Sequence, residues 1–484
     1  MIAERSKSDL LDLDASSIAQ HIRAGRISSY EATKTYIQHI KHMNERINCL
    51  VEERFDEALR EAKKCDNGLK EGAVKGQLFG VPIAVKDMFN VAGMRTTSGL
   101  VHRANTLESE DSEVVRRLKR EGAIIIGKTN TGVLGLHFES SNKIHGTTNN
   151  PWDQSRTAGG SSGGCAALVA SGGAAVSVGS DIFGSLRNPA HFNGVITFKC
   201  GAYQVSNEGH IPSPAAYPLQ EAMLGIGALS KSVADAELIN SIIANNVPPE
   251  VNVDEFRIVI PEPKYKVSEE TRVALDIVRT YLKESFSVET NIDVPHLNPM
   301  LTIDHLQILS IDGGKDVWPI AFDNDERFPI FRTLVQELVK KNTDYDYFFL
   351  KTMALGKVGT VLFGTNSKKI GGLERKIAEK IADANRFLDK TILLLPSYPT
   401  PAKKHRKLDG EVFSNRLQVL TKMPYTSYAN VLGLPALSVP ITEDKDGLPI
   451  SLQLISRIGN EKALFHFGTL LEKEFRGYKR AKHI

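Results

Sequence analysis

The chain has 484 residues, of which 41% are hydrophobic, and its 60 basic and 57 acidic residues leave a formal net charge of +3. This balance gives no indication of a nucleic-acid partner or of binding to an anionic membrane surface. The sequence contains no run of about 18 apolar residues, so we expect no transmembrane helix. Residues 1–14 lack the apolar segment of a secretory signal.

The four cysteines, Cys49, Cys65, Cys165 and Cys200, form no C-x-x-C pair and have no spacing typical of a zinc site. We therefore expect reduced thiols, no metal, no other cofactor and a cytoplasmic location. Cys165 lies within a glycine- and serine-rich tract, where we interpret it as a small packed thiol.

Apolar spacing in the first 130 residues predicts alternating helices and strands, which is typical of an α/β protein. Helices are expected over residues 15–24, 29–44, 54–64 and 112–120, and strands over residues 81–85 and 123–126. Ser28 and Glu31 have the spacing of a capping box at the start of the second helix. The first strand is short, apolar and β-branched, which indicates a buried strand with Lys86 at its end.

The most distinctive stretch runs from Gly159 to Ala190 and is dense in glycine, serine and alanine. Such a stretch allows several backbone N–H groups to point toward a ligand. It is not a P-loop, because no lysine stands in the G-x-x-x-x-G-K-[ST] position, and it does not match the dinucleotide fingerprint G-x-G-x-x-G. We interpret it as a serine-rich turn, a short helix over residues 165–170 and a second turn ending in Ser185.

Beyond this tract the alternation continues, without repeats, low-complexity segments or an evident linker. Residues 305–363 are mixed in pattern and rich in aromatic side chains. Helices are expected over residues 231–243 and 268–284, and strands over residues 195–198, 256–260, 286–289, 393–395, 436–439 and 449–455.

Three motifs resemble those of the amidase signature hydrolases. Residues 159–164 read G-G-S-S-G-G, residues 179–190 read G-S-D-I-F-G-S-L-R-N-P-A, and residues 80–87 read G-V-P-I-A-V-K-D. The family pattern is long and constrained, and its two serines have the spacing of Ser161 and Ser185.

The resemblance covers nearly the whole chain and is weakest over residues 240–390. It implies an α/β fold in which one large mixed β-sheet is covered by helices on both faces, within a single domain of residues 1–484. Residues 139–146 look closest to the fatty-acid amide hydrolase branch. Within the domain we expect an N-terminal helical layer (1–70), a catalytic core (80–235), a variable, substrate-shaping region (240–390) and a C-terminal part of the sheet (390–470).

A serine hydroxyl becomes a good nucleophile only when a neighbouring base takes its proton. None of the 13 histidines lies in a G-x-S-x-G setting. A lysine can act as the base when burial lowers its pKa, and Lys86 at the end of an apolar strand fits that requirement. The resemblance implies that Lys86 moves protons through Ser161 to the nucleophile Ser185, and that a cis peptide bond precedes Ser161.

The turn before Ser185 is the natural place for an oxyanion hole, because its backbone N–H groups lie beside the nucleophile. We expect donors from Ile182, Phe183 and Gly184 together with Ser185 itself. Asp181 and Arg187 flank the turn and are interpreted as an ion pair that supports it.

Phe183 is the one departure from the signature, because the family has a small residue at this position. A phenyl ring keeps the backbone N–H, but it would be strained if the turn required a positive φ there. We expect the ring to fill space near the helix after Gly164 or in the substrate cleft, and in the cleft to narrow the substrate pocket.

Three functions remain open at this stage. The first is an amidase that hydrolyses a carboxylic amide, a small molecule, to an acid and an amine or ammonia through an acyl-enzyme. The second is the glutaminase component (the A component) of glutamyl-tRNA amidotransferase, although this chain has Met423 where that component carries a glutamine-holding Asp. The third is a non-catalytic relative. The first predicts no nucleic-acid partner and no membrane span, and allows a homodimer.

Overall fold

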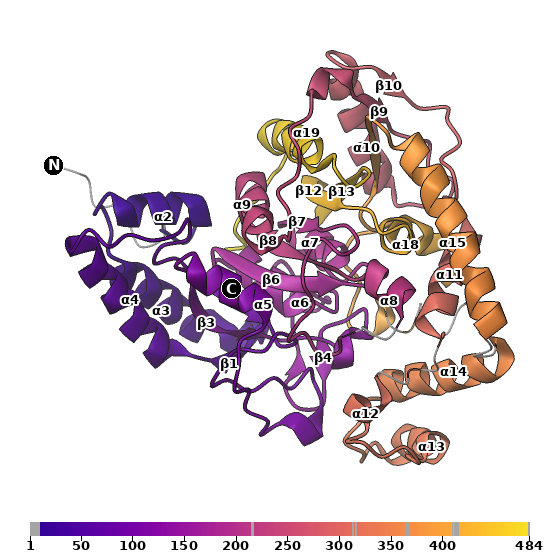
Figure 1. The fold of residues 1–484 in the computed structure, drawn as a ribbon, viewed down its shortest axis with the longest axis horizontal. Coiled ribbons are helices and arrows are strands. Elements are labelled where there is room, and N and C mark those ends of the chain that lie inside the picture. Colours follow the sequence, from indigo (N-terminus) through magenta and orange to yellow (C-terminus); the bar gives the residue numbers. More distant parts are fainter. Residues whose placement is uncertain are drawn as a thin grey trace.

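The computed structural model describes residues 10–213, 217–311, 314, 317–363, 367–408, 410 and 416–482. One mixed sheet of 11 strands runs through this part of the chain (Figure 1). Strand β2 is parallel to both β3 and β6, and β9 is parallel to β10 and β11, whereas the other neighbours are antiparallel. In order across the sheet the strands are β1 (Leu50–Glu53), β3 (Ile124–Thr129), β2 (Pro82–Lys86), β6 (Val176–Asp181), β8 (Gly225–Ser230), β7 (Ile196–Lys199), β12 (Ala436–Glu443), β13 (Pro449–Ile455), β11 (Thr391–Pro396), β9 (Arg257–Val259) and β10 (Val288–Glu289).

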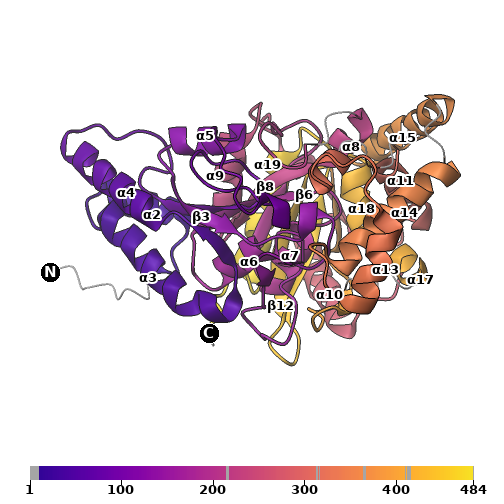
Figure 2. The same cartoon turned by 90° about the horizontal axis from the view of Figure 1, so that it is seen from below.

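Helices lie on both faces of the sheet (Figures 1 and 2), which confirms the predicted fold class. The first face carries α2 (Ala15–Arg23), α5 (Glu113–Arg120), α9 (Val233–Ile243), α10 (Glu269–Lys283) and α19 (Glu461–Glu474). The second face carries α3 (Ser29–Ile47), α4 (Phe55–Lys70), α6 (Gly163–Ala170), α7 (Arg187–Asn193), α11 (Pro299–Leu309), α15 (Ser367–Phe387) and α18 (Pro424–Val431). The other helices named below are α8 (Pro218–Met223), α12 (Trp318–Ala321), α13 (Ile330–Lys340), α14 (Tyr347–Phe363) and α17 (Arg416–Lys422).

The alternation of side chains along β2 decides which face holds Lys86. Ile83 and Val85 pack in an apolar cluster with α2, α5 and α9, whereas Ala84 packs with α3, α4 and α6. Successive side chains of a strand point to opposite faces, so Lys86 lies on the same face as Ala84 and α6.

Local signals place several elements correctly. The capping box at α3 is present, with Ser28 Oγ accepting from the N–H of Glu31 at 3.0 Å and Glu31 Oε2 accepting from the N–H of Ser28 at 3.1 Å. Helix α9 differs from its prediction because it begins at Val233 with Ser232 as its cap, while Ser230 is the last residue of β8. Strands β1, β6 and β8 were not predicted from the sequence. The last two are rich in glycine and serine, which are poor strand signals.

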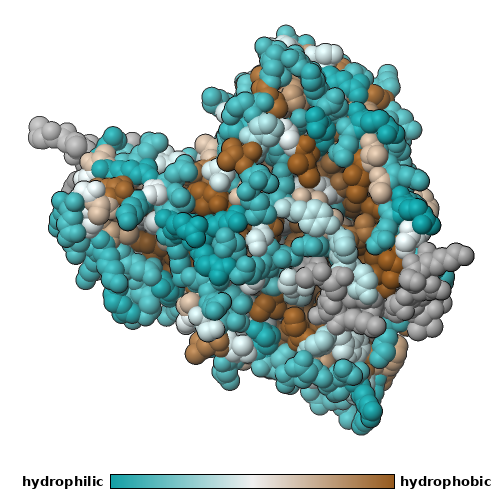
Figure 3. Space-filling model, in the orientation of Figure 1, coloured by the Kyte–Doolittle hydropathy of each residue, from teal (hydrophilic) through white to brown (hydrophobic). Residues whose placement is uncertain are grey.

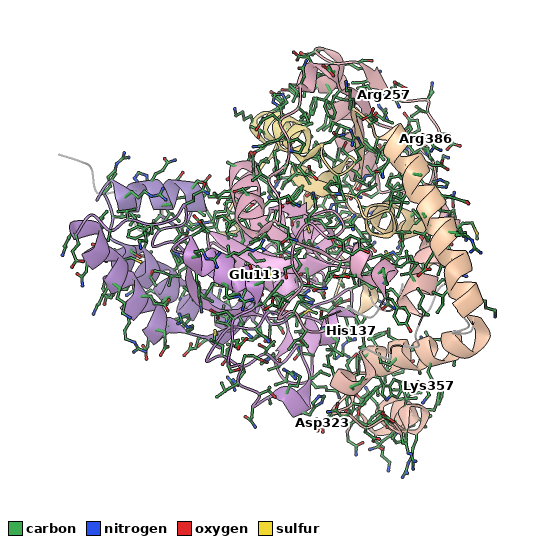
Figure 4. The ribbon with its side chains drawn as sticks, in the orientation of Figure 1. Glu113, His137, Arg257, Asp323, Lys357 and Arg386 are labelled. Atoms are coloured by element: carbon green, nitrogen blue, oxygen red, sulfur yellow. The ribbon has the colours of Figure 1, made fainter. Side chains whose placement is uncertain are left out.

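Residues 318–363 form an arm of three helices, α12 to α14, at the lower right of Figure 1. Phe322 and Phe349 of this arm pack in one apolar cluster with Leu134 of the core. His137 Nε2 lies 3.7 Å from Oδ1 of Asp346 at the start of α14, and Figure 4 shows His137 between the core and the arm. The division of the chain into a helical layer, a core and a substrate-shaping region stays a prediction.

No helix in the described ranges is long and apolar enough to cross a membrane. All four cysteines lie in those ranges and are free thiols, and Cys165 is buried as expected.

Gly227 in β8 offers a test of the central packing. A Cβ at this position would lie 1.7 Å from the backbone oxygen of Phe198, so Gly227→Ala must displace β7. We expect a loss of about 1–3 kcal/mol of unfolding free energy in urea. Gly372→Ala is the matched control, because a Cβ in α15 meets nothing within 4 Å and alanine favours the helix by up to about 1 kcal/mol. Equal stability of the two variants would contradict this account.

Candidate active site

The three resemblance motifs meet at one edge of the sheet. β2 and β6 are parallel neighbours, with Ala84 opposite Ser177 and Val85 opposite Val178. Their carboxyl ends therefore lie side by side, which brings Lys86 next to Ser180 and Asp181. The turn after β6 leads directly into α7, and the N-terminal end of α6 lies on the same face.

Lys86 is fully buried, and among the described residues its amine has hydrogen-bond contacts only with hydroxyl and carbonyl oxygens. Its Nζ lies 2.8 Å from Ser161 Oγ, 3.2 Å from Ser180 Oγ and 3.5 Å from the backbone oxygen of Ser180. Burial lowers the pKa of Lys86 to about 8, against smaller opposing effects of Cys165 and Asp181. A large fraction of the amine is therefore neutral near that pH and able to accept a proton.

The backbone at Ser161 and Ser162 is hydrogen-bonded to Ser140 and to the Ser185 turn. The peptide bond between Gly160 and Ser161 is cis, as the resemblance implies. Ser140 Oγ donates to the backbone oxygen of Ser161 at 2.8 Å, and the N–H of Ser162 donates to the backbone oxygen of Ser185 at 3.2 Å. The structure thus brings Lys86, Ser161 and the Ser185 turn together from three separate segments.

The turn that carries Ser185 reverses the chain between β6 and α7. Gly184 has a φ of 90°, a conformation that favours glycine, and a Cβ there would lie 2.4 Å from Cγ2 of Thr426. Phe183 is not among the residues with positive φ, so the strain that its side chain could have caused does not arise.

The N–H groups of the turn are not equivalent. The N–H of Gly184 donates to Oδ1 of Asp181 at 2.7 Å, so this predicted oxyanion donor is already engaged in the structure. The N–H groups of Ile182, Phe183 and Ser185 have no hydrogen-bond partner in the described part of the chain. These three groups therefore remain as candidate donors to a substrate oxygen.

Asp181 and Arg187 form the predicted ion pair, fully buried, with 3.0 Å between Oδ2 and Nε. Burial by itself would raise the pKa of Asp181, but the Arg187 guanidinium outweighs this effect and holds the pKa well below its usual range. Arg187 also donates to Gln453, to the backbone oxygen of Thr426 and to Asn430. The pair therefore ties the turn to β13 and α18, which agrees with a structural role.

Ser180 and His210 form a buried hydrogen-bonded pair next to Lys86 that was not predicted from the sequence. His210 Nε2 lies 2.9 Å from Ser180 Oγ, and its Nδ1 lies 2.7 Å from the backbone oxygen of Pro212. Burial lowers the pKa of His210 to about 4, so the ring is neutral. Since the Pro212 oxygen can only accept, Nδ1 carries the proton and Nε2 accepts from the Ser180 hydroxyl. Ser180 stood in a recognised motif, whereas no sequence pattern marked His210.

Phe183 packs away from α6, in a cluster of apolar side chains on the side of α11 and α17. Its ring centroid lies 5.3 Å from that of Phe138 and 3.9 Å from that of His305, which is a second residue without a sequence signal. The cluster consists of Phe138, Phe183, Phe192, Tyr398, Ala402, Leu408, Val419 and Met423. Whether the ring narrows a substrate pocket stays a prediction.

A cavity of about 460 Å³ lies elsewhere, between α8, α15 and the loop after α18. It is lined by Tyr203, Leu219, Ile381 and Arg457 among others, and apolar side chains are visible over this region in Figure 3. None of the predicted catalytic residues lines this cavity. We therefore place the candidate active site at the two serines and Lys86, and not in this cavity.

Comparisons with known proteins identify the family of the chain. The model of the Amidase family matches residues 31–465, and the chain therefore belongs to that family. It is 29% identical over 499 residues to fatty-acid amide hydrolase 2 of Homo sapiens, covering 97% of this chain and 90% of that protein. It is also 29% identical over 501 residues to the A component of the glutamyl-tRNA(Gln) amidotransferase of Carboxydothermus hydrogenoformans, covering 97% of this chain and 99% of that protein.

Among solved structures, 6-aminohexanoate cyclic dimer hydrolase in complex with its substrate superimposes with a TM-score of 0.81 at 21% identity, covering 98% of this chain and 99% of that one. This likeness shows the fold. The family assignment identifies the class of the protein as an amide hydrolase.

The Asp181–Arg187 pair leads to a stability prediction. Arg187→Met leaves a buried carboxylate without its countercharge, and we expect a loss of about 3–5 kcal/mol of unfolding free energy at neutral pH. Arg60→Met is the control, because it removes only an exposed ion pair with Glu57 and should change stability by less than about 1 kcal/mol. The pKa of Asp181 is lower in the folded state, so its contribution should be complete above about pH 4 and decline as the pH falls further. Equal urea midpoints for the two variants would contradict the prediction.

Proposed function

We propose that the protein hydrolyses a carboxylic amide with Ser185 as nucleophile, Ser161 as proton carrier and Lys86 as base. The observation that carries this proposal is the buried amine of Lys86, which lies 2.8 Å from Ser161 Oγ and has no carboxylate in hydrogen-bond contact within the part of the chain that the structure describes. A buried lysine without a negatively charged partner has a lowered pKa. Part of it is therefore present as the neutral amine, which is the form that can take a proton.

The hydrogen bonds around Lys86 support a direction for the proton. A neutral amine has two N–H groups and one lone pair. Ser180 offers two acceptors, its backbone oxygen and its hydroxyl, and that hydroxyl gives its own proton to His210. With both N–H groups directed to Ser180, the lone pair is left for the hydroxyl proton of Ser161.

In the proposed reaction Ser161 passes its proton to Lys86 and takes the proton of Ser185, whose oxygen attacks the amide carbon. In this reaction the N–H groups of Ile182, Phe183 and Ser185 stabilise the oxyanion. As the tetrahedral intermediate collapses, the C–N bond breaks and the leaving amine receives the proton from Lys86 through Ser161. Water then takes the place of the amine: it gives a proton through Ser161 to Lys86 as its oxygen attacks the acyl carbon. The bond to Ser185 breaks, Ser185 recovers its proton from Lys86 through Ser161, and the acid is released.

The surroundings of Met423 favour an apolar acyl group as substrate. Met423 is fully buried in the same cluster as Phe183 and Phe138, at the position where the amidotransferase component carries a glutamine-holding Asp. An apolar cluster offers no countercharge to the amino group of glutamine. The similarity to a fatty-acid amide hydrolase points in the same direction.

The A component of an amidotransferase is the second candidate, because relatives of that name match nearly the whole chain. Ammonia release from glutamine that appears only with a tRNA-binding partner would establish it. We instead propose a small-molecule amide as substrate, without a nucleic-acid partner, in the cytoplasm. A homodimer stays a prediction.

The nucleophile is tested with Ser185→Ala. Wild-type protein should be labelled by a fluorophosphonate and should hydrolyse an acyl anilide, whereas Ser185→Ala should be folded, unlabelled and inactive because the attacking oxygen is absent. The exposed Ser285→Ala is the control and should behave as wild type. Labelling of Ser185→Ala would refute the assignment. A wild type that is neither labelled nor active would instead favour the non-catalytic relative.

The base is tested by the pH dependence of kcat/KM. We expect kcat/KM to rise with pH through an apparent pKa near 8, because only the neutral amine of Lys86 accepts the proton. Lys86→Ala should remove this rise and cost several orders of magnitude in rate. Lys199→Met is the control, since burial also lowers the pKa of Lys199 to about 8 but its amine donates to the backbone oxygen of Cys200 at 2.9 Å. A rise that persists in Lys86→Ala, or that disappears in Lys199→Met, would assign the base elsewhere.

A further inference from the structure

His305 is a buried residue of α11 that contacts the turn before Ser185 in two ways. Its Nε2 lies 2.9 Å from the backbone oxygen of Ile182, and its ring lies against that of Phe183, with 3.9 Å between centroids. The residue is fully buried and comes from the region where the family resemblance is weakest. It lies outside every motif of the signature.

The protonation state of His305 follows from its surroundings. Burial lowers the pKa of His305 to about 3, so the ring is neutral and carries a single N–H. The Ile182 oxygen can only accept a hydrogen bond, so that N–H is on Nε2. Nδ1 has no hydrogen-bond partner among the described residues, which is consistent with this tautomer. His305 is therefore a donor to the turn.

The hydrogen bond to Ile182 also orients the next N–H group. The peptide bond between Ile182 and Phe183 is trans, so the oxygen of Ile182 and the N–H of Phe183 point in opposite directions. A donor that holds the oxygen therefore fixes the direction of the N–H. The N–H of Phe183 has no partner in the described part of the chain.

The preceding peptide is held in the same manner. Asn430 Nδ2 donates to the backbone oxygen of Asp181 at 3.1 Å, which fixes the direction of the N–H of Ile182. Two successive carbonyl groups are thus held by side chains of α18 and α11, and each hydrogen bond fixes the direction of the N–H group in the same peptide.

We propose that His305 is a positioning residue that holds the Ile182–Phe183 peptide so that the N–H of Phe183 points at the carbonyl oxygen of the substrate. The phenyl ring of Phe183 adds to this by packing against the imidazole, with an angle of 39° between the ring planes. A glycine in its place would leave the peptide freer to rotate. Phe183, at which the chain departs from the signature, and His305 of α11 therefore restrain the same peptide together.

Helix α11 is itself anchored beside His305. The fully buried carboxylate of Asp304 accepts from Lys376 Nζ at 2.5 Å and from Lys380 Nζ at 2.6 Å, both on α15. A positioning residue acts only if its own backbone is held, and these ion pairs supply that support. The region predicted to shape the substrate pocket thereby also supports the oxyanion turn.

The test rests on the proposed function and uses three variants of the full chain. His305→Gln keeps an N–H donor of similar reach, His305→Asn has the same amide one methylene shorter, and His305→Phe keeps an aromatic ring without a donor. For each variant we would measure kcat and KM on an acyl anilide, the affinity for a trifluoromethyl ketone and the thermal midpoint. The ketone forms a tetrahedral adduct with the nucleophile and so reports on the oxyanion hole.

We expect His305→Asn and His305→Phe to lower kcat by about tenfold or more, because a full donor is worth about 100- to 1000-fold. KM should stay within about twofold, and ketone affinity should fall in parallel with kcat. His305→Gln should keep kcat within about threefold of wild type. If His305→Phe does not fold, the comparison of Gln with Asn decides.

Equal kcat in the Gln and Asn variants, in a protein whose Ser185 is labelled by fluorophosphonate, would overturn this inference and leave the proposed function intact. A rise in KM without loss of kcat or ketone affinity would also overturn it. Absence of both labelling and hydrolysis in the wild type would instead refute the proposed function, and the role of His305 with it.

Discussion

The carboxylate of Asp181 organises the turn that carries the candidate nucleophile. It accepts hydrogen bonds from the N–H groups of Gly184 and Leu186, from the guanidinium of Arg187 and from Asn430. A buried charge is tolerated only when it is paired and hydrogen-bonded, and Asp181 meets both conditions. These contacts therefore fix the turn, the start of α7 and the end of α18 relative to the carboxylate of Asp181. The geometry of Ser185 depends on that arrangement.

Lys86 is buried as well, but the charges around it differ from those around Asp181. Asp181 has a countercharge at 3.0 Å, whereas the hydrogen-bond contacts of the Lys86 amine, over the described ranges, are the oxygens of Ser161 and Ser180. The Arg187 guanidinium thus keeps Asp181 ionised despite its burial, whereas burial makes Lys86 easier to deprotonate. This difference separates a group that supports the structure from a group suited to proton transfer, although both stand at the ends of neighbouring strands.

Part of the region 240–390 contacts the turn before Ser185. Helix α11 reaches that turn through His305, and the ion pairs of Asp304 hold this helix against α15. The arm of α12 to α14 packs on the core through Phe322, Phe349 and Leu134. Changes of sequence in this region can therefore alter the orientation of a backbone N–H in the signature turn as well as the shape of the surrounding space. The aromatic side chain of Phe183 contacts this region at His305.

The sequence by itself determined the class of fold, the segment ends marked by caps, and the three motifs that carry Lys86, Ser161 and Ser185. These features are local: a capping box spans four residues, and a buried strand is indicated by its apolar side chains. Only the tertiary structure decided that the N–H of Gly184 is engaged by Asp181, and that Ser180, His210, His305 and Asn430 surround the site. The Ile182–His305 contact joins residues 123 positions apart and the Asp181–Asn430 contact residues 249 apart. Nothing in the local pattern of a histidine or an asparagine indicates such a partner, because the order of the strands and the packing of helices on the sheet create the contact.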